Sequence, residues 1–248
     1  MSTTYEDIIR EQAILEMRDE VIMKTATLAQ RIYLFVEGYS EEKAIPILLE
    51  RCDIDMEKLG IIIANYSGIG NLKHFLKILG KTLNHDRPII VTYDNDEAGK
   101  TVPSQISKMF KNKQLVSLVC VPYKPVIQYS SGHCGGTYEE SFEFNDFITA
   151  CFTEGIINHD LLNFKNEFKQ KFDVTKPWYP QIINFCKEKN KTEYVVDKVK
   201  LAVELAENSN TIPETYKYLA EKLIDVRKKH PVKHPEDVEL TPIKGLTC

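Results

Sequence analysis

Four short runs of apolar residues alternate with longer segments in which charged and apolar residues are mixed. The runs cover residues 31–38 (RIYLFVEG), 60–68 (GIIIANYSG), 87–96 (RPIIVTYDND) and 114–123 (QLVSLVCVPY). Continuous apolar runs of this length are typical of strands that are buried on both faces of a parallel sheet. The pattern therefore predicts four buried strands.

The segments before and between these runs have the character of helices. Residues 5–30 lack Gly and Pro and predict one helix, continuous or broken once. Ser40 is expected to cap the next helix, in which Pro46 predicts a kink or a later start. Two more helices are expected at residues 71–83 and 98–110. Because strands and helices alternate, we predict an α/β fold with a parallel sheet flanked by helices.

The alternation ends after residue 124. A Gly- and Ser-containing loop is expected at residues 129–140 and helical segments to about residue 229. The last residues contain three prolines and predict an irregular tail. The second half of the chain is therefore expected to be a mainly helical part that follows the sheet.

Composition narrows the class of protein. The chain has 248 residues, of which 43% are hydrophobic and 27% charged, as in ordinary globular proteins. It has neither an apolar stretch of about 20 residues nor a secretory signal, so we expect a cytoplasmic protein that does not enter membranes. The six cysteines have no regular spacing and are expected to be reduced. The net charge of −4 disfavours a non-specific coat protein for nucleic acids.

Several acidic residues follow the ends of the predicted strands. Glu37 ends the first strand, Asp94 and Asp96 end the third, and Glu41 lies one helical turn beyond Glu37. In an open parallel sheet, ligands bind beyond the carboxyl ends of the strands. Two charges about 4 Å apart repel by about 4 kcal/mol at an effective dielectric of 20. A hard divalent cation would remove this cost, and oxygen ligands favour Mg²⁺ or Mn²⁺.

Three of these acids also have a purely structural interpretation. Glu41 is suited to the positive end of a helix, and Asp94 and Asp96 are suited to a turn. Two phosphate-binding motifs fail: a P-loop around Lys100 would need a glycine at Asp94, and a dinucleotide motif would need one at Lys73. The carboxylates therefore remain the main candidates for chemistry.

The order of these motifs resembles a TOPRIM domain. VEGYSEE follows one predicted strand, GIGN follows the second, and YDNDEAG follows the third. The E-G-x-S-E form, with Glu37 and Glu41, resembles the nucleases of the OLD (overcoming lysogenization defect) family. The resemblance extends over roughly residues 31–208. It implies a TOPRIM core at residues 31–125, preceded by an N-terminal helix at 1–30. A helical extension at 126–230 would complete the active site, and 231–248 would form the tail.

The same resemblance implies a set of metal ligands. In these nucleases two divalent ions are held by both glutamates, the aspartates and a later Ser-x-Glu element. Ser141 and Glu143, in the sequence SFE, match that element and follow the glycine loop. The implied ligands are therefore Glu37, Glu41, Asp94, Asp96, Ser141 and Glu143, and the implied cofactor is Mg²⁺ or Mn²⁺, expected as two ions.

One lysine is a candidate for catalysis. On a helical projection of residues 195–208, Lys198 falls inside the apolar arc, where it must extend to solvent or find an anion. The OLD pattern also has a lysine here, which would stabilise charge on the scissile phosphate or the leaving oxygen. Lys200, on the polar face, is the second choice.

We therefore expect a two-metal endonuclease that acts on DNA or RNA, with Glu37 as metal ligand or general base. The alternatives are primase-like nucleotidyl transfer and a nucleic-acid-binding protein with a degenerate site. OLD proteins usually carry an ATPase, but no Walker motif is present here, and only about 30 residues precede the first strand. The chain is then a stand-alone nuclease or part of a larger one. A stand-alone form suggests a bacterial anti-phage effector with a separate ABC-type ATPase partner, and the N-terminal helix offers an ATPase or homodimer contact.

Overall fold

The structure, a computed structural model, describes residues 5–82, 87–109, 115–124, 127–128, 134–189 and 196–237. Four parallel strands form one sheet in the order β2-β1-β3-β4. They are β1 Ile32–Val36, β2 Ile61–Asn65, β3 Ile89–Asp94 and β4 Val116–Val121. These strands coincide with the four apolar runs, and the predicted α/β class is confirmed.

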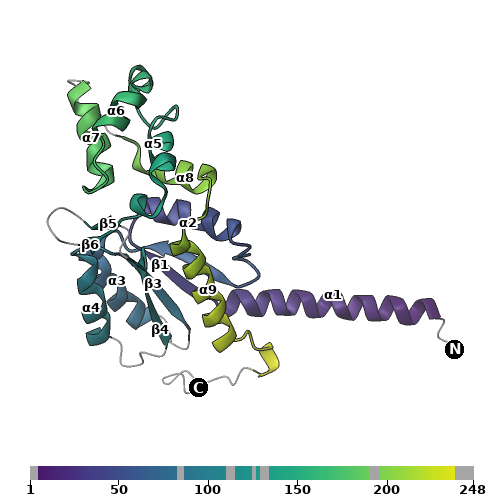
Figure 1. Cartoon of the computed structure of the whole chain (residues 1–248). Helices are drawn as coiled ribbons and strands as arrows, with labels where there is room; N and C mark the ends of the chain where they lie inside the picture. Colours follow the sequence, from purple (N-terminus) through teal and green to yellow (C-terminus); the bar gives the residue numbers. More distant parts are fainter. Residues whose placement is uncertain are drawn as a thin grey trace.

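Helices cover both faces of the sheet (Figure 1). Successive side chains of a strand point to opposite faces. On β1, Leu34 and Val36 pack in a core that includes residues of α2, α8 and α9, and Phe35 packs in a second core with α3 and α4. These helices are α2 Tyr39–Arg51, α3 Ile69–Thr82, α4 Val102–Met109, α8 Lys198–Asn208 and α9 Glu214–Lys229. The α4 helix is preceded by a 3-10 turn, η1 Gly99–Thr101. Burial on both faces explains why the strands are apolar throughout.

The start of α2 differs from the prediction. The helix begins at Tyr39, Gly38 is its N-cap, and no side chain caps it. Ser40 is therefore not the cap but a buried residue of the first turn. Pro46 lies inside the helix, so the later start, one of the two alternatives, is wrong, and the kink stays a prediction. The helix continues through the proline because residues such as Ile45 and Leu48 are buried against the sheet, and tertiary packing outweighs local propensity.

The segment after the sheet forms a helical lobe. It contains η3 Glu139–Ser141, α5 Phe144–Cys151, η4 His159–Phe164, α6 Lys165–Lys171 and α7 Trp178–Lys189. A two-stranded antiparallel pair, β5 Ile127–Gln128 and β6 Cys134–Gly135, precedes it. The sequence did not indicate this pair because each strand has only two residues. The predicted irregular tail falls largely in residues 238–248, outside the described part.

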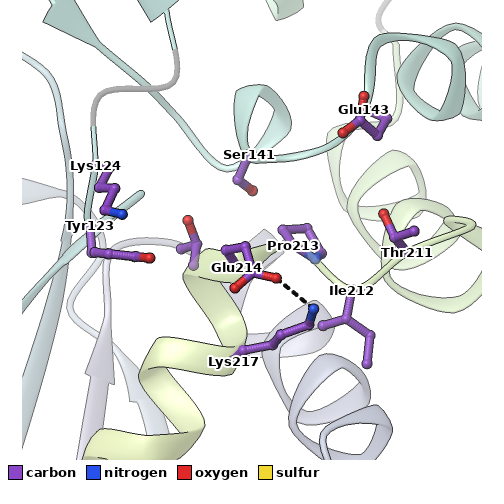
Figure 2. Close-up of a pocket in the computed structure, with 10 residues that line it drawn as sticks. Tyr123, Lys124, Ser141, Glu143, Thr211, Ile212, Pro213, Glu214 and Lys217 are labelled. Carbon is purple, nitrogen blue, oxygen red and sulfur yellow. Dashed lines mark hydrogen bonds and ion pairs between the residues drawn. The ribbon is translucent and has the colours of Figure 1, made fainter.

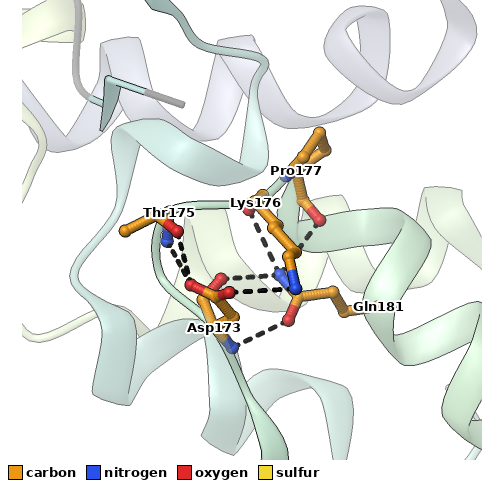
Figure 3. A network of polar contacts seen from close by, with 5 residues as sticks. All are labelled: Asp173, Thr175, Lys176, Pro177 and Gln181. Atoms are coloured by element: carbon orange, nitrogen blue, oxygen red, sulfur yellow. Dashed lines mark hydrogen bonds and ion pairs between the residues drawn. The ribbon is translucent and has the colours of Figure 1, made fainter. Parts of the chain in front are cut away.

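A polar network sets the turn between α6 and α7 (Figure 3). The Gln181 amide donates to the carbonyl oxygens of Asp173, Lys176 and Pro177, and its oxygen accepts from the Asp173 N–H. The Asp173 carboxylate accepts from the hydroxyl and N–H of Thr175, and these bonds lower its pKa to about 2. The network fixes the chain where α7 begins.

The first helix, α1 Tyr5–Ala29, projects from the body of the molecule (Figure 1). Its outer turns leave large apolar side chains exposed, among them Ile14, Met17 and Val21. Ala26, near its C-terminal end, is buried. Among the described residues, no helix combines the length and the apolar character that crossing a bilayer requires.

Candidate functional site

The central strands bring Glu37 and Asp94 together. Glu37 follows the last residue of β1, and Asp94 is the last residue of the neighbouring parallel strand β3. The Glu37 carboxylate accepts from the Asp94 N–H at 3.5 Å. Burial raises the pKa of Glu37, and the nearby charges of Glu41 and Asp96 raise it further. The carboxyl ends of two adjacent strands therefore place acids at one edge, as expected for an open parallel sheet.

Asp94 has the most perturbed environment of these acids. Burial raises its pKa well above the ordinary value, and the charges of Glu37, Glu41 and Glu139 act in the same direction. A carboxylate with this environment costs free energy when it is ionised without a cation nearby. Asp94 is therefore a strong candidate for a cation ligand.

Glu41 reaches the same edge from the first turn of α2. A Cβ atom at Gly38 would lie 2.9 Å from Glu41 Oε2, so the carboxylate folds back over the glycine. Burial raises the pKa of Glu41, Lys198 opposes this effect, and Glu139 adds to it. The small residue of the E-G-x-S-E motif thus makes room for the second glutamate.

Asp96 has the turn role that was considered for it and also lies near the other acids. Its Oδ1 accepts from the Gly99 N–H at 2.7 Å and closes the turn after β3. A Cβ atom at Gly99 would lie 1.8 Å from the Asp94 carbonyl oxygen, so only glycine fits there. The charge of Asp96 nevertheless raises the pKa values of Glu37 and Asp94. Asp96 therefore shapes the loop and belongs to the acidic cluster.

A further acid, Glu139, joins the cluster without having been anticipated from the sequence. Its side chain is 1% exposed, and Oε2 accepts from the Thr137 hydroxyl at 2.8 Å. Oε1 accepts no hydrogen bond from any described residue but lies 3.6 Å from Lys198 Nζ. An unsatisfied buried carboxylate oxygen is costly, so Glu139 is suited to a cation.

The loop that carries Glu139 is clamped by its neighbour Glu140. The buried Glu140 carboxylate accepts from the backbone N–H of Thr137 at 2.9 Å and from the backbone N–H of Trp178 at 3.0 Å. Trp178 is the first residue of α7, so the helical lobe and the acid-bearing loop are joined directly. This arrangement positions Glu139 against the sheet edge.

In the described part of the chain, neither Ser141 nor Glu143 forms a hydrogen bond or ion pair with the clustered acids, and their role as metal ligands stays a prediction. Ser141 Oγ donates to the Tyr138 carbonyl oxygen at 2.6 Å. Glu143 is exposed and is the N-cap of α5. Both line a separate pocket, shown in Figure 2, that none of the clustered acids lines. Thr137-Tyr138-Glu139 has a hydroxyl residue and a glutamate at the same spacing, and this signal was available in the sequence.

Lys198 is placed among the acids and Lys200 is not. Lys198 is the first residue of α8, and its side chain is 43% exposed. Burial lowers its pKa, but the charges of Glu139, Glu41 and Asp94 outweigh burial and raise it. Lys200 Nζ instead lies 3.6 Å from Asp197, the residue that caps α8. Lys198 is therefore the lysine that can act at this edge.

The donor set fits a hard divalent cation. Glu37, Glu41, Asp94, Asp96 and Glu139 offer only oxygen atoms, which suits Mg²⁺ or Mn²⁺. Across the described ranges, no three His, Cys, Asp or Glu side chains already lie close enough together to hold a metal ion. Holding an ion would therefore require these carboxylates to rotate toward a common point.

Comparisons with known proteins agree with this architecture. Residues 29–96 match the model of the "Overcoming lysogenization defect protein-like, TOPRIM domain" family. The C-terminal region of the Burkholderia pseudomallei OLD protein has a similar structure, with a TM-score of 0.50 and 17% sequence identity over 79% of this chain and 98% of that one. The corresponding region of the Xanthomonas campestris pv. campestris OLD protein gives a TM-score of 0.49 and 16% sequence identity. The match covers 83% of this chain and 98% of that one.

No curated protein sequence matches the chain. The matched residues 29–96 include Glu37, Glu41, Asp94 and Asp96, and they end before Glu139 and Lys198. The similarity to the Burkholderia pseudomallei structure shows the fold over a larger part of the chain. The chain therefore contains an OLD-like TOPRIM domain, and over most of its length it has the fold of the C-terminal region of an OLD protein.

Proposed function

We propose that this protein is a metal-dependent nuclease that hydrolyses phosphodiester bonds of nucleic acids. The observation that carries the proposal is the buried Glu139 Oε1, which lacks a hydrogen bond and lies 3.6 Å from Lys198 at the edge where Glu41 and Asp94 are found. A buried anion, further acids and one cation at the carboxyl ends of parallel strands form a site that can hold cations and a charged substrate.

The acids fall into two overlapping groups. Glu37 contacts Asp94, and its pKa is raised first by burial and then by the charges of Glu41 and Asp96. Burial has the largest effect on the pKa of Glu41, and the charges that act on it are those of Lys198 and Glu139. Two groups that share one edge support a site for two ions, with Glu37, Asp94 and Asp96 on one side and Glu41 and Glu139 on the other. When bound, two such ions would supply charge stabilisation for the phosphate and a lower pKa for the attacking water.

We assign Lys198 the role of a fixed positive charge beside the scissile phosphate. Its ammonium is held near Glu139 but remains partly exposed, so it can contact a ligand in solvent. Its raised pKa keeps it protonated at neutral pH. A cation in this position would stabilise negative charge as it develops on the departing oxygen.

The direct test is incubation of the full chain with plasmid DNA and with tRNA in Mg²⁺ or Mn²⁺. The wild type should cleave at least one of them, and Glu37→Ala should not. Glu50→Ala is a matched control, because Glu50 is an exposed acid on α2, the helix that carries Glu41. Incorporation of nucleotides would instead support a primase-like enzyme. Inactivity on both substrates together with no metal binding would support a degenerate binding protein.

We also propose a biological setting, an anti-phage effector that works with a separate ATPase. It is supported by the OLD-like domain and by the exposed apolar side chains of α1, which offer a surface for a partner or for a second copy. Replacing Ile14, Met17 and Val21 with polar residues should abolish ATPase capture or dimerisation and leave the nuclease active. Retained assembly would exclude α1 as the contact.

A further inference from the structure

A groove lies beside the acidic cluster and has no role in the proposed chemistry. It has a volume of about 440 Å³ and lies between the end of β4, η3 and the start of α9 (Figure 2). In the sheet, Val121 of β4 pairs with Asp94, and Tyr123 and Lys124 follow just beyond it. Ser141, which lines the groove, belongs to the same 3-10 turn as Glu139. The groove therefore opens at the same edge as the acids.

The two ends of the groove have opposite character. Tyr123 and Lys124 lie at one end and Glu143 at the other (Figure 2). Between them, Lys217 and Glu214 form an ion pair of 2.6 Å and largely cancel one another. In the described part of the chain, no carboxylate forms an ion pair with Lys124, and no cation forms one with Glu143. An anionic ligand group would therefore enter at the Lys124 end.

The same end carries an aromatic surface. The Tyr123 ring stacks on Tyr218 with centroids 4.3 Å apart, which fixes its orientation. Lys124 Nζ lies over the Tyr123 ring at 5.2 Å and is exposed. A planar group that packs on the ring can displace the flexible lysine toward an adjacent anion. An aromatic ring next to an exposed ammonium that has no carboxylate partner among the described residues matches a base with its neighbouring phosphate.

We propose that this groove binds one unpaired nucleotide of the substrate strand, next to the phosphate that is cut. Lys124 contacts the backbone phosphate, and Tyr123 packs against the base. Ring contact requires a base that is out of the double-helical stack, so the substrate is single-stranded or has an unpaired nucleotide beside the cleavage position. The proposal rests on the nuclease function and names the class of substrate for it.

The test measures binding without cleavage. The full chain carrying Glu37→Gln is mixed, in Ca²⁺, with a single-stranded 12-nucleotide DNA that contains 2-aminopurine, whose fluorescence falls when it stacks. We expect binding with quenching. Tyr123→Ala should weaken binding at least about fivefold and abolish quenching, and Tyr123→Phe should preserve both because it keeps the ring. Lys124→Gln should weaken binding. It should also make the slope of log K against log salt concentration less negative by about 0.7, the value for one phosphate contact in a single strand.

A control variant, a duplex ligand and a nucleotide competitor complete the experiment. Lys222→Gln should bind like the parent, because Lys222 covers the Tyr218 ring at 4.9 Å but does not line the groove. A fully paired duplex of the same sequence should bind without quenching. Displacement by an equal concentration of dAMP would assign the groove to free nucleotides and overturn the proposal. Circular dichroism verifies the fold of Tyr123→Ala, and Lys124→Gln tests the groove independently if that variant unfolds.

The two proposals fail in different ways. If the wild type cleaves nucleic acid but Tyr123→Ala binds and quenches like its parent, the groove proposal is wrong and the nuclease proposal stands. If the oligonucleotide binds with Tyr123-dependent quenching but no substrate is cleaved, the groove stands and the nuclease proposal fails. Absence of oligonucleotide binding in every variant overturns the groove proposal.

Discussion

Glu139 Oε1 lies 3.6 Å from Lys198 Nζ, although the two residues come from different parts of the helical region. Glu139 starts the η3 turn and is buried, whereas Lys198 starts α8 and is partly exposed. The pair joins the loop after β6 to the helix that packs on α2. It therefore places one fixed anion and one accessible cation beside the acids of the sheet edge.

This contact distinguishes the two lysines that the sequence left as alternatives. Lys198→Met should lower kcat about 10²–10³-fold and leave Mn²⁺ affinity nearly unchanged, because the ammonium acts on developing charge rather than on the ion. Lys200→Met should retain wild-type kcat, since its ammonium lies near Asp197 and the Gly155 carbonyl oxygen. Cleavage kinetics and Mn²⁺ titration calorimetry measure both quantities. Equal losses in the two variants would refute the assignment.

The position of Glu139 also predicts which glutamate holds metal. Changes to outer-shell partners alone typically alter metal affinity about 10–100-fold, so Glu139→Gln should weaken Mn²⁺ binding by at least about tenfold. Glu143→Gln should bind Mn²⁺ like the wild type, because Glu143 lines the separate groove. Mn²⁺ electron paramagnetic resonance titrations of the three proteins provide the comparison. A loss of affinity only in Glu143→Gln would restore the sequence-based choice.

Gly99 is required by the geometry of the loop after β3. Gly99→Ala would place a Cβ atom 1.8 Å from the Asp94 carbonyl oxygen, which forces the backbone to move. Overpacking of this kind costs about 1–3 kcal/mol, and here it also displaces Asp96. Gly70→Ala is the matched control, because nothing lies within 4 Å of its Cβ position and the residue is helical. Urea unfolding should show a lower free energy of unfolding for Gly99→Ala and no decrease for Gly70→Ala. Equal stability of the two variants would contradict the structure.

The raised pKa values of Glu37, Glu41 and Asp94 predict how stability depends on pH in EDTA. A group whose pKa is higher in the folded than in the unfolded state contributes stability that is fully present below the unfolded pKa. That stability is lost as pH rises through the folded pKa. The free energy of unfolding should therefore contain a term that falls from about pH 4 toward neutral pH.

Asp94→Asn isolates this term, because the other titrating groups are common to both proteins. The difference in unfolding free energy, Asp94→Asn minus wild type, should increase with pH in EDTA. Saturating Mn²⁺ should reverse the trend, since the ion binds the ionised carboxylates of the wild type. Urea titrations between pH 5 and 8 measure this difference. A difference in unfolding free energy that is independent of pH would show that burial does not destabilise the ionised form of the Asp94 carboxyl group.

The sequence was most informative about the sheet and the acids on it. Glu37 and Asp94 end apolar runs that are typical of buried strands, and parallel pairing of these strands places both acids at one edge. Asp96 and Glu41 lie within a few residues of those strand ends, so local backbone geometry places them near the same edge. These acids depend on short-range rules, namely strand period and helix turn, that can be applied to a sequence alone.

Glu139 depends on contacts between distant segments and was therefore missed. Its position is set by Glu140, which binds the N–H of Trp178 in α7, and by the packing of α8 beside Lys198. The sequence contains two hydroxyl-x-Glu elements here, at Thr137 and at Ser141, and spacing alone does not separate them. The cap of α2 was misplaced for a different, local reason: the Glu41 carboxylate folds back over Gly38, which is the N-cap of a helix that begins at Tyr39.

The most direct test of the account is anomalous diffraction from crystals of the full chain soaked in Mn²⁺. We predict manganese peaks at the carboxyl ends of β1 and β3, bound by Glu37, Asp94 and Asp96 on one side and by Glu41 and Glu139 on the other. Manganese that binds only elsewhere in the molecule, or fails to bind at all, would contradict the claim that these acids share divalent ions.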